Sequence, residues 1–176
     1  MSEFPRPMTA AEARRQSGPL HLAADVGERA AIAARFGLVA LDRLDAELAF
    51  TCDGDDIGVT GTLAADVVQA CVATGEPIPA RIATAVTVRF VPNDRLEVAE
   101  TDAEVELVGD ELDIIGYAGG RFDVGDMVAE TMALALDPFP RRPDADAWLA
   151  ERGVKREDEV GAFGALAGLR DQLGKA

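Results

Sequence analysis

Residues 46–63 read AELAFTCDGDDIGVTGTL, and this stretch decides the fold class because it encodes a β-hairpin. In its first half, apolar side chains stand at every second position from Ala46 to Phe50, the pattern of a half-buried strand. In its second half the alternation resumes from Ile57 to Leu63, with one glycine gap. The DGDD between the halves is rich in turn formers, so the stretch predicts two antiparallel strands joined by a tight turn.

Two segments carry the start signal of a helix, in each case Asp-Val-Gly followed by a second acid. Asp25 and Asp123 are placed as N-caps that accept hydrogen bonds from the first turn. Gly37 supplies a left-handed C-cap for the first helix, and Pro138 ends the second. The second helix has an apolar stripe at helical spacing, formed by Val124, Met127, Val128, Met132 and Ala135. We expect this second helix to be the better packed of the two.

Three further strands are predicted, over residues 20–24, 82–90 and 112–117. Residues 97–111 are acidic with weak alternation, so they are expected to form either a ragged edge strand or a mobile loop. These elements indicate an α+β fold. We expect a curved, barrel-like antiparallel β-sheet of five or six strands packed with two main helices.

The composition changes after Pro143. Residues 1–143 are expected to form a single domain, in which residues 1–19, with three prolines, are an extended N-terminal arm. Residues 144–176 begin as a polar stretch and continue as an apolar repeat interrupted by glycines, which weaken a helix. They are predicted to be an appended, partly ordered C-terminal tail.

The charge of the chain is −15 and is unevenly distributed. Residues 1–43 carry +1, residues 44–137 carry −16, and residues 138–176 carry no net charge. Because an acidic surface repels phosphate, residues 44–137 are a poor surface for RNA. Any RNA contact is therefore expected at the two arginine-bearing ends. Solvation alone also explains a charged face.

No arrangement of residues that supports catalysis, cofactor binding or metal binding is found in the sequence. His21 is the only histidine, and alone it completes neither a hydrolytic triad nor a zinc site. The glycine-rich residues 116–125 lack the lysine of a phosphate loop. The aspartates of the DGDD turn lack the downstream glutamate of a calcium loop. We therefore expect no enzyme activity, no cofactor and no metal.

The setting is expected to be cytoplasmic, because no signal peptide or membrane span is seen. Cys52 and Cys71 are then reduced thiols, expected as small core residues.

Three segments, in this order and at these separations, resemble the YceD family of large ribosomal RNA subunit accumulation proteins in its alphaproteobacterial form. They are Glu28-Arg29-Ala30 running to Arg35-Phe36-Gly37-Leu38, then Gln69-Ala70-Cys71-Val72-Ala73-Thr74-Gly75-Glu76-Pro77, then Asp123-Val124-Gly125 through Leu134 to Arg141. The resemblance starts at Glu3-Phe4-Pro5-Arg6-Pro7 and reaches about Pro143. The domain over residues 1–143 is thus YceD-like.

The middle segment departs from the pattern of many relatives, which carry Cys-x-Arg-Cys-Leu-Glu. Cys71 and Glu76 match that pattern, whereas Thr74 stands at the second cysteine. A further cysteine pair of many relatives has no counterpart after Pro138. Threonine does not supply a thiolate ligand, so we expect this fold to hold without metal.

The resemblance implies a bacterial ribosome biogenesis factor that supports accumulation of large-subunit (23S) ribosomal RNA. We expect a non-catalytic adaptor that binds a basic protein partner in ribosome assembly or rRNA processing. The alternative is a direct RNA-binding module that uses the arginines of the chain ends, namely Arg6, Arg14, Arg15, Arg29, Arg35, Arg141 and Arg142. A small-molecule enzyme is the third choice, and a deep pocket lined by charged motif residues would favour it.

The candidate partner-binding residues are Arg29, Arg35, Glu76, Glu130, Phe139 and Arg141. Ordinary structural explanations stand beside this role. Arg29 and Arg35 are solvated or pair with acids of the sheet, Glu76 closes a turn before Pro77, Glu130 lies on the exposed face of its helix, and Phe139 folds back over the sheet. Leu134 and Leu136 are expected in the core.

Overall fold

The computed structural model describes residues 2–96 and 113–154. The chain divides into two compact units. The larger comprises Met1–Gln69 and Pro79–Pro138, and the smaller Ala70–Ile78 and Phe139–Ala176. The predicted edge strand or loop at residues 97–111 lies outside the described residues.

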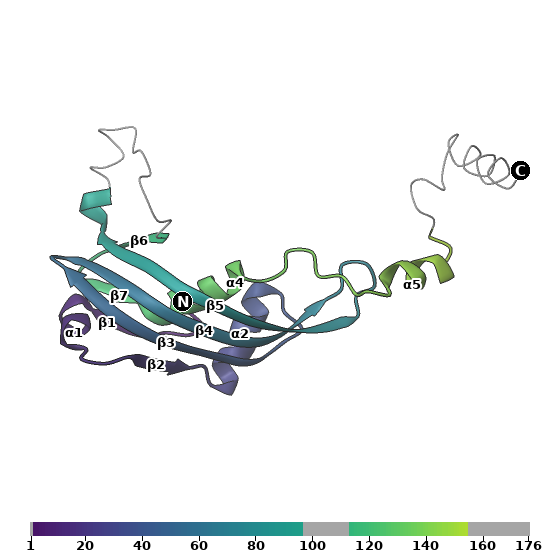
Figure 1. Ribbon diagram of the computed structural model, residues 1–176, viewed down its shortest axis with the longest axis horizontal. Coiled ribbons are helices and arrows are strands. Elements are labelled where there is room, and N and C mark those ends of the chain that lie inside the picture. Colours follow the sequence, from purple (N-terminus) through teal and green to yellow (C-terminus); the bar gives the residue numbers. More distant parts are fainter. Residues whose placement is uncertain (1, 97–112, 155–176) are drawn as a thin grey trace, which may run out of the picture. The chain divides into compact units, whose positions relative to one another are not determined.

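The elements with defined bounds are, in chain order, β1 (Pro7–Thr9), α1 (Ala10–Arg15), β2 (Leu20–Ala23), α2 (Val26–Phe36), β3 (Ala40–Asp53), β4 (Asp56–Ala70), β5 (Pro77–Pro92), β6 (Asp113–Tyr117), β7 (Arg121–Asp123), α4 (Val124–Leu134) and α5 (Ala145–Glu151) (Figure 1). A five-stranded sheet has the order β2-β3-β4-β5-β6, and β1 and β7 form a separate two-stranded sheet. The α+β class is confirmed.

The predicted hairpin is the centre of the five-stranded sheet. β3 and β4 pair antiparallel from Ala40 opposite Val68 to Asp53 opposite Asp56, with one irregularity near Leu41. Gly54 in the turn has a φ of 58°, a backbone conformation that glycine adopts without strain. The two halves of the quoted stretch therefore pair as their alternation predicted.

The expectations of a barrel-like and wholly antiparallel sheet are wrong. A barrel closes only when its first and last strands pair, whereas β2 and β6 stand at opposite edges of this sheet. β6 also pairs with β5 in parallel, from Val88 opposite Asp113 to Pro92 opposite Tyr117. Each strand was visible in its own residues, but a local apolar pattern does not encode the direction of the neighbouring strand.

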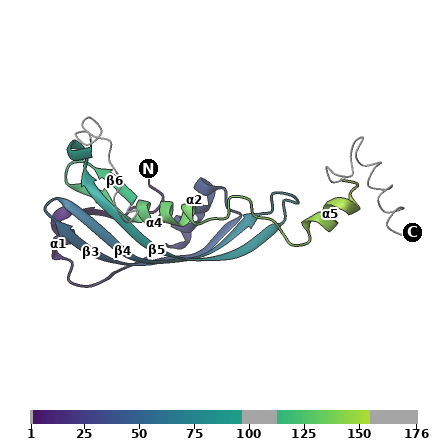
Figure 2. The same cartoon turned by 45° about the horizontal axis from the view of Figure 1, so that its top comes forward.

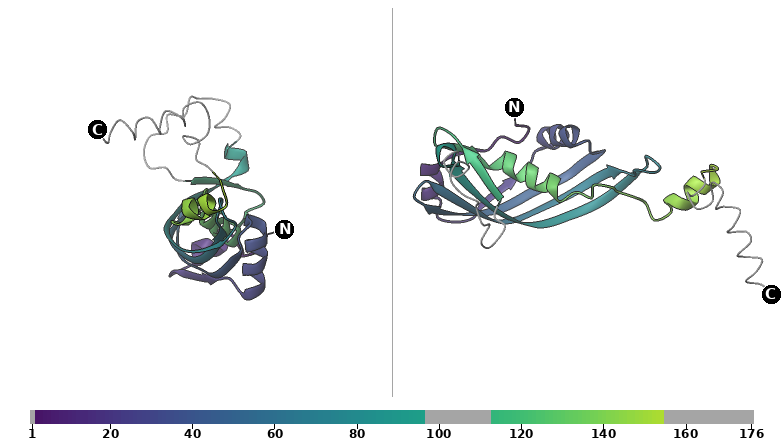
Figure 3. Two further views of the ribbon diagram at one scale, coloured as in Figure 1. Left: turned by 90° about the vertical axis from the view of Figure 1, so that its right-hand side faces the viewer. Right: turned by 90° about the horizontal axis from the view of Figure 1, so that it is seen from above.

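One face of the sheet carries the core. Side chains that alternate along β3, β4 and β5 are buried there, among them Leu48, Val59 and Phe90 at no more than 2% exposure. α4 lies along this inner side, above the bowed strands (Figures 2 and 3). The apolar stripe of α4 is buried as predicted, except that Ala135 is exposed.

The N-terminal arm is extended only in part. Thr9 caps α1 through a capping box with Glu12, in which each residue bonds the backbone N–H of the other. The TAAE sequence that begins α1 held this signal, but the prolines around it led to the expectation of an extended arm. Phe4 is 1% exposed, so the arm also supplies a large side chain to the core.

The two predicted helix starts are confirmed. The Asp25 carboxylate accepts the backbone N–H of Glu28, and the Glu28 carboxylate accepts that of Asp25. Asp123 Oδ1 accepts the N–H groups of Gly125 and Asp126. Gly37 ends α2 with a φ of 65°, the left-handed cap expected of it.

The smaller unit is built from a turn and a short helix. Gly75 donates its N–H to the carbonyl of Cys71, and Cys71 donates to the carbonyl of Glu76. α5 lies within residues 144–176, the segment predicted as a tail, and residues 155–176 lie outside the described residues. Cys71 is buried, whereas Cys52 is exposed, so the expectation of a core position is wrong for Cys52.

Candidate interaction site

An ion-pair cluster joins three separate parts of the larger unit. Arg35, near the C-terminus of α2, bonds Glu3 of the arm at 3.1 Å and Asp126 of α4 at 2.7 Å. Its second terminal nitrogen lies 3.0 Å from Glu130. These bonds, with that to Asp126 as the largest cause, raise the pKa of Arg35 above its ordinary value. One guanidinium is thus shared by three carboxylates, which we call the Arg35 cluster.

A second arginine fixes the arm. Arg6 bonds both carboxylate oxygens of Glu28, at 2.6 and 3.0 Å, in the bidentate geometry that guanidinium groups favour. Its backbone N–H bonds Asp123 at 2.9 Å, and its carbonyl accepts the N–H of Val124 at 3.2 Å. The pKa of Glu28 is lowered, chiefly by the hydrogen bond from Arg6.

The arm also approaches α4 at its backbone. A Cβ added at Gly125 would lie 1.9 Å from the carbonyl oxygen of Phe4, a distance that no side chain tolerates. Gly125 is therefore required by the close approach of the arm. Residues 3–7, 28–38 and 123–130, far apart in sequence, meet at this place.

In the smaller unit, the turn of the middle segment contacts the residues that follow α4. Val72 donates its N–H to the carbonyl of Pro140 at 2.9 Å, and the N–H of Arg142 lies 3.5 Å from the Cys71 sulfur. The Thr74 hydroxyl, first, and then the Arg142 N–H lower the pKa of the Cys71 thiol to about 7. The turn therefore holds a buried thiol surrounded by hydrogen-bond donors.

A family model described as "Large ribosomal RNA subunit accumulation protein YceD" matches residues 59–170, more than half of the chain. The chain belongs to the YceD family. The match includes the second and third of the quoted segments and begins after the first. Comparison with the curated proteins and with the solved structures gave no match. Through this family the chain has a role in bacterial ribosome biogenesis, namely the accumulation of large-subunit ribosomal RNA.

The candidate residues of this YceD protein fall into two groups. Arg35 and Glu130 are paired with each other on the larger unit, and Arg29 donates to the carbonyl of Ala24 at 2.7 Å. The other group belongs to the smaller unit. There Glu76 and Phe139 are exposed and Arg141 pairs with Asp146.

The sequence analysis missed the other members of the Arg35 cluster, Glu3 and Asp126, and the Arg6–Glu28 pair. The spacing of opposite charges within one segment gave no signal, because every one of these pairs joins distant segments. Leu134 was expected in the core but is 80% exposed, since it lies at the end of α4 and away from the apolar stripe. Leu136 packs against the core, as expected.

The described arginines of the chain ends are engaged within the molecule. Carboxylates pair with Arg6, Arg14, Arg35, Arg141 and Arg142, and backbone carbonyls accept bonds from Arg15 and Arg29. These are the residues through which a direct RNA contact was expected. Their positive charge is largely balanced where they lie.

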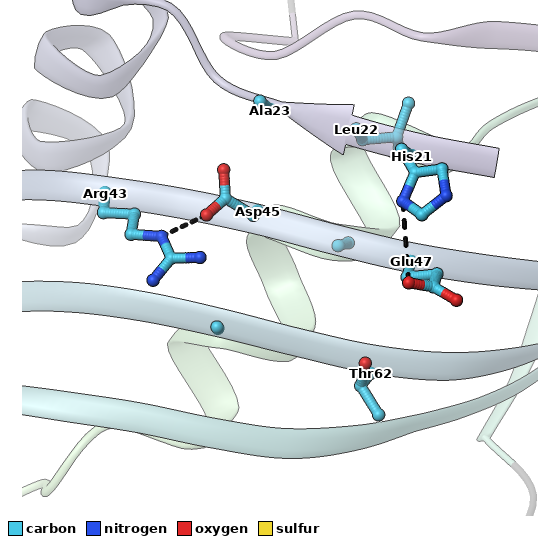
Figure 4. A pocket seen from close by; sticks show the side chains of 9 residues that line it. His21, Leu22, Ala23, Arg43, Asp45, Glu47 and Thr62 are labelled. Atoms are coloured by element: carbon cyan, nitrogen blue, oxygen red, sulfur yellow. Dashed lines mark hydrogen bonds and ion pairs between the residues drawn. The ribbon is translucent and has the colours of Figure 1, made fainter.

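Several hollows of the described surface are open rather than deep. One lies on the outer face of β2, β3 and β4, where Arg43 pairs with Asp45 and His21 stands 3.6 Å from Glu47 (Figure 4). None of these four residues belongs to the three segments that resemble the YceD family. Within residues 2–96 and 113–154, no three His, Cys, Asp or Glu side chains gather as metal ligands would. No helix of the same residues has the length and apolarity needed to cross a membrane.

Proposed function

We propose that this YceD protein is a non-catalytic adaptor that supports accumulation of large-subunit ribosomal RNA by binding a basic protein of ribosome assembly or rRNA processing. The observation that carries the proposal is the internal bonding of the described arginines at the chain ends. RNA-binding surfaces need lysine or arginine side chains that release counterions from phosphates. Arginines already neutralised by carboxylates contribute less to such a surface.

The acidic balance of the chain favours a protein partner. With a net charge of −15, the molecule attracts basic proteins and orients them before contact. In the larger unit the Arg35 cluster includes the half-exposed Glu130 of α4. In the smaller unit, Phe139 is 75% exposed and Val72 57%. An exposed aromatic side chain with an arginine two residues away is a common anchor of interfaces.

The absence of catalysis is part of the proposal. The outer-face hollow is lined by residues outside the three family segments and has no ordered nucleophile and base. A third reading as a small-molecule enzyme called for a deep pocket of charged motif residues. The outer-face hollow is open rather than deep, and this favours an adaptor.

Depletion of the protein tests the role. Cells that lose it should contain less mature large-subunit ribosomal RNA relative to small-subunit RNA, measured by gradient sedimentation. An unchanged ratio after full depletion would remove the assignment to ribosome biogenesis for this chain.

Capture of partners from the native cytoplasm, with and without ribonuclease, tests the adaptor. Basic assembly or ribosomal proteins that remain bound after ribonuclease treatment are expected. If all binding disappears with the RNA, and purified protein binds RNA with a steep salt dependence, the direct RNA-binding alternative replaces the adaptor.

A further inference from the structure

A groove of about 250 Å³ opens between β6 and α4 on the larger unit. Its floor is apolar and formed by Phe90, Phe122 and Met127, which are 2%, 6% and 2% exposed. Asp126 and Glu130 stand on the α4 side, and Ile115 lies on the β6 side. All these residues fall within the span matched by the YceD family model.

The α4 wall of the groove is short of positive charge. The carboxylates of Glu3, Asp126 and Glu130 share the single guanidinium of Arg35, which leaves two negative charges in excess. Arg35 bonds one oxygen of Asp126 and one of Glu130. These two side chains are 36% and 49% exposed, so a cation from solution reaches them.

The size of the groove favours a peptide over a metabolite. Small-molecule sites usually enclose roughly 300–1,000 Å³, whereas this groove is smaller and open along one side. It accommodates one apolar side chain. Among the described strands β6 stands at an edge of the five-stranded sheet, and an extended chain adds to such an edge through backbone hydrogen bonds.

We propose that this groove docks an extended basic segment of a partner protein, with an apolar side chain over Phe90 and Met127 and a lysine or arginine beside Asp126 and Glu130. The inference rests on the proposed adaptor function and names its binding surface. Arg121 also lines the groove, so the added cation belongs at the α4 wall, where the excess of carboxylates lies.

A labelled synthetic peptide of about nine residues that alternates lysine with leucine is the probe, measured by fluorescence anisotropy. It should bind the full chain, and binding should weaken with salt. A peptide with glutamate in place of lysine should not bind. Ala118→Trp fills the groove from its exposed lining and should abolish binding, whereas Ala118→Ser should leave it unchanged.

Charge variants separate the groove from general attraction to an acidic protein. Glu130→Gln should lower the affinity for the peptide roughly two- to five-fold, the usual range for one exposed charge pair. Glu47→Gln removes the same charge from the outer face of β3 and should have no effect. Equal loss in both variants would mean that the peptide senses only net charge, and the groove assignment would fail.

Cross-linking keeps the test decisive if Ala118→Trp does not fold. A photoreactive group on the central leucine of the probe should label residues 114–118 or 126–130 of the unaltered chain. Labelling elsewhere, or no binding at all, overturns the groove. Either result concerns the groove alone, because the adaptor function is tested by partner capture. Failure of one proposal is therefore distinguishable from failure of the other.

Discussion

Glu28 has two tasks, since it caps α2 and holds Arg6 of the arm. Its carboxylate accepts hydrogen bonds from the backbone N–H of Asp25 and from both terminal nitrogens of Arg6. The lowered pKa of Glu28 means that its charged form is stabilised on folding. Stability from this group is therefore complete above the unfolded carboxyl pKa and is lost as the pH falls through the lower, folded pKa.

Glu28→Gln should lower the free energy of unfolding by about 1–2 kcal/mol at neutral pH, because a charge-assisted pair and part of a cap are lost. The difference from the unaltered chain should shrink in acid, as measured by denaturant unfolding across pH. Glu12→Gln is the control, because it alters the other capping glutamate, which has no bidentate arginine. A difference between the unaltered chain and the Glu28 variant that is constant across pH would contradict the assignment.

The Cys71 thiol should titrate near neutrality. Thr74 and the N–H of Arg142 donate to its sulfur and lower its pKa to about 7. In a Cys52→Ser background, thiolate absorbance should reach half its maximum near pH 7. Thr74→Val should move the midpoint upward and Thr74→Ser should preserve it. A midpoint unaffected by Thr74→Val would show that the hydroxyl is not the main donor.

The same turn makes a metal prediction. The resemblance to the YceD family places Thr74 where many relatives are expected to carry a cysteine. A four-ligand zinc site also needs partners that the described residues do not gather. Purified protein should contain no stoichiometric zinc, and a chelator should leave its melting temperature unchanged. One zinc per chain by elemental analysis would refute this prediction.

At the scale of elements, most of the fold follows from local signals. The capping residues in the sequence predicted where α2 and α4 begin, and the apolar alternation predicted the positions of β3, β4 and β5. The DGDD turn predicted the pairing of β3 with β4. The parallel pairing of β6 and the separate sheet of β1 and β7 did not follow, because both depend on contacts between distant segments. The Arg35 cluster was missed for the same reason.

The two Asp-Val-Gly helix starts look alike in sequence but differ in surroundings. A Cβ at Gly27 would lie 3.4 Å from the side chain of Asp25, an ordinary contact, whereas at Gly125 it would strike the Phe4 carbonyl. Gly125→Ala should therefore destabilise the protein by roughly 1–3 kcal/mol through displacement of the arm. Gly27→Ala, the matched control, should be neutral or stabilising by up to about 1 kcal/mol.

Thermal and denaturant unfolding of the two glycine variants measures this difference. Hydrogen exchange at residues 3–7 gives a second measurement, because only the Gly125 variant should release the arm. Similar effects of both substitutions would mean that the arm moves away from the added methyl group at little energetic cost. The proposed role of the arm in holding α2 to α4 would then be contradicted.

At the scale of the whole molecule, the candidate sites divide between two units. The sequence analysis named Arg35 and Glu130 separately as candidates for a partner, and the structure pairs them with each other. The sequence left Phe139 either at an interface or folded over the sheet, and Phe139 is 75% exposed. Exposure of an aromatic side chain is set by tertiary structure, so the sequence left both readings open.

The double change of Phe139 and Arg141 to Ala tests that interface in cells. Phe139 lies outside the core, and Arg141 makes an exposed pair with Asp146, so removal of both should leave the melting temperature within a few degrees. Removal of an aromatic anchor and its neighbouring arginine should still abolish rescue of the depletion phenotype. Val154→Ala, an exposed apolar change in the same unit, should rescue fully. An unfolded double variant would place the segment among the structural residues, and a folded variant that rescues would show that the partner binds elsewhere.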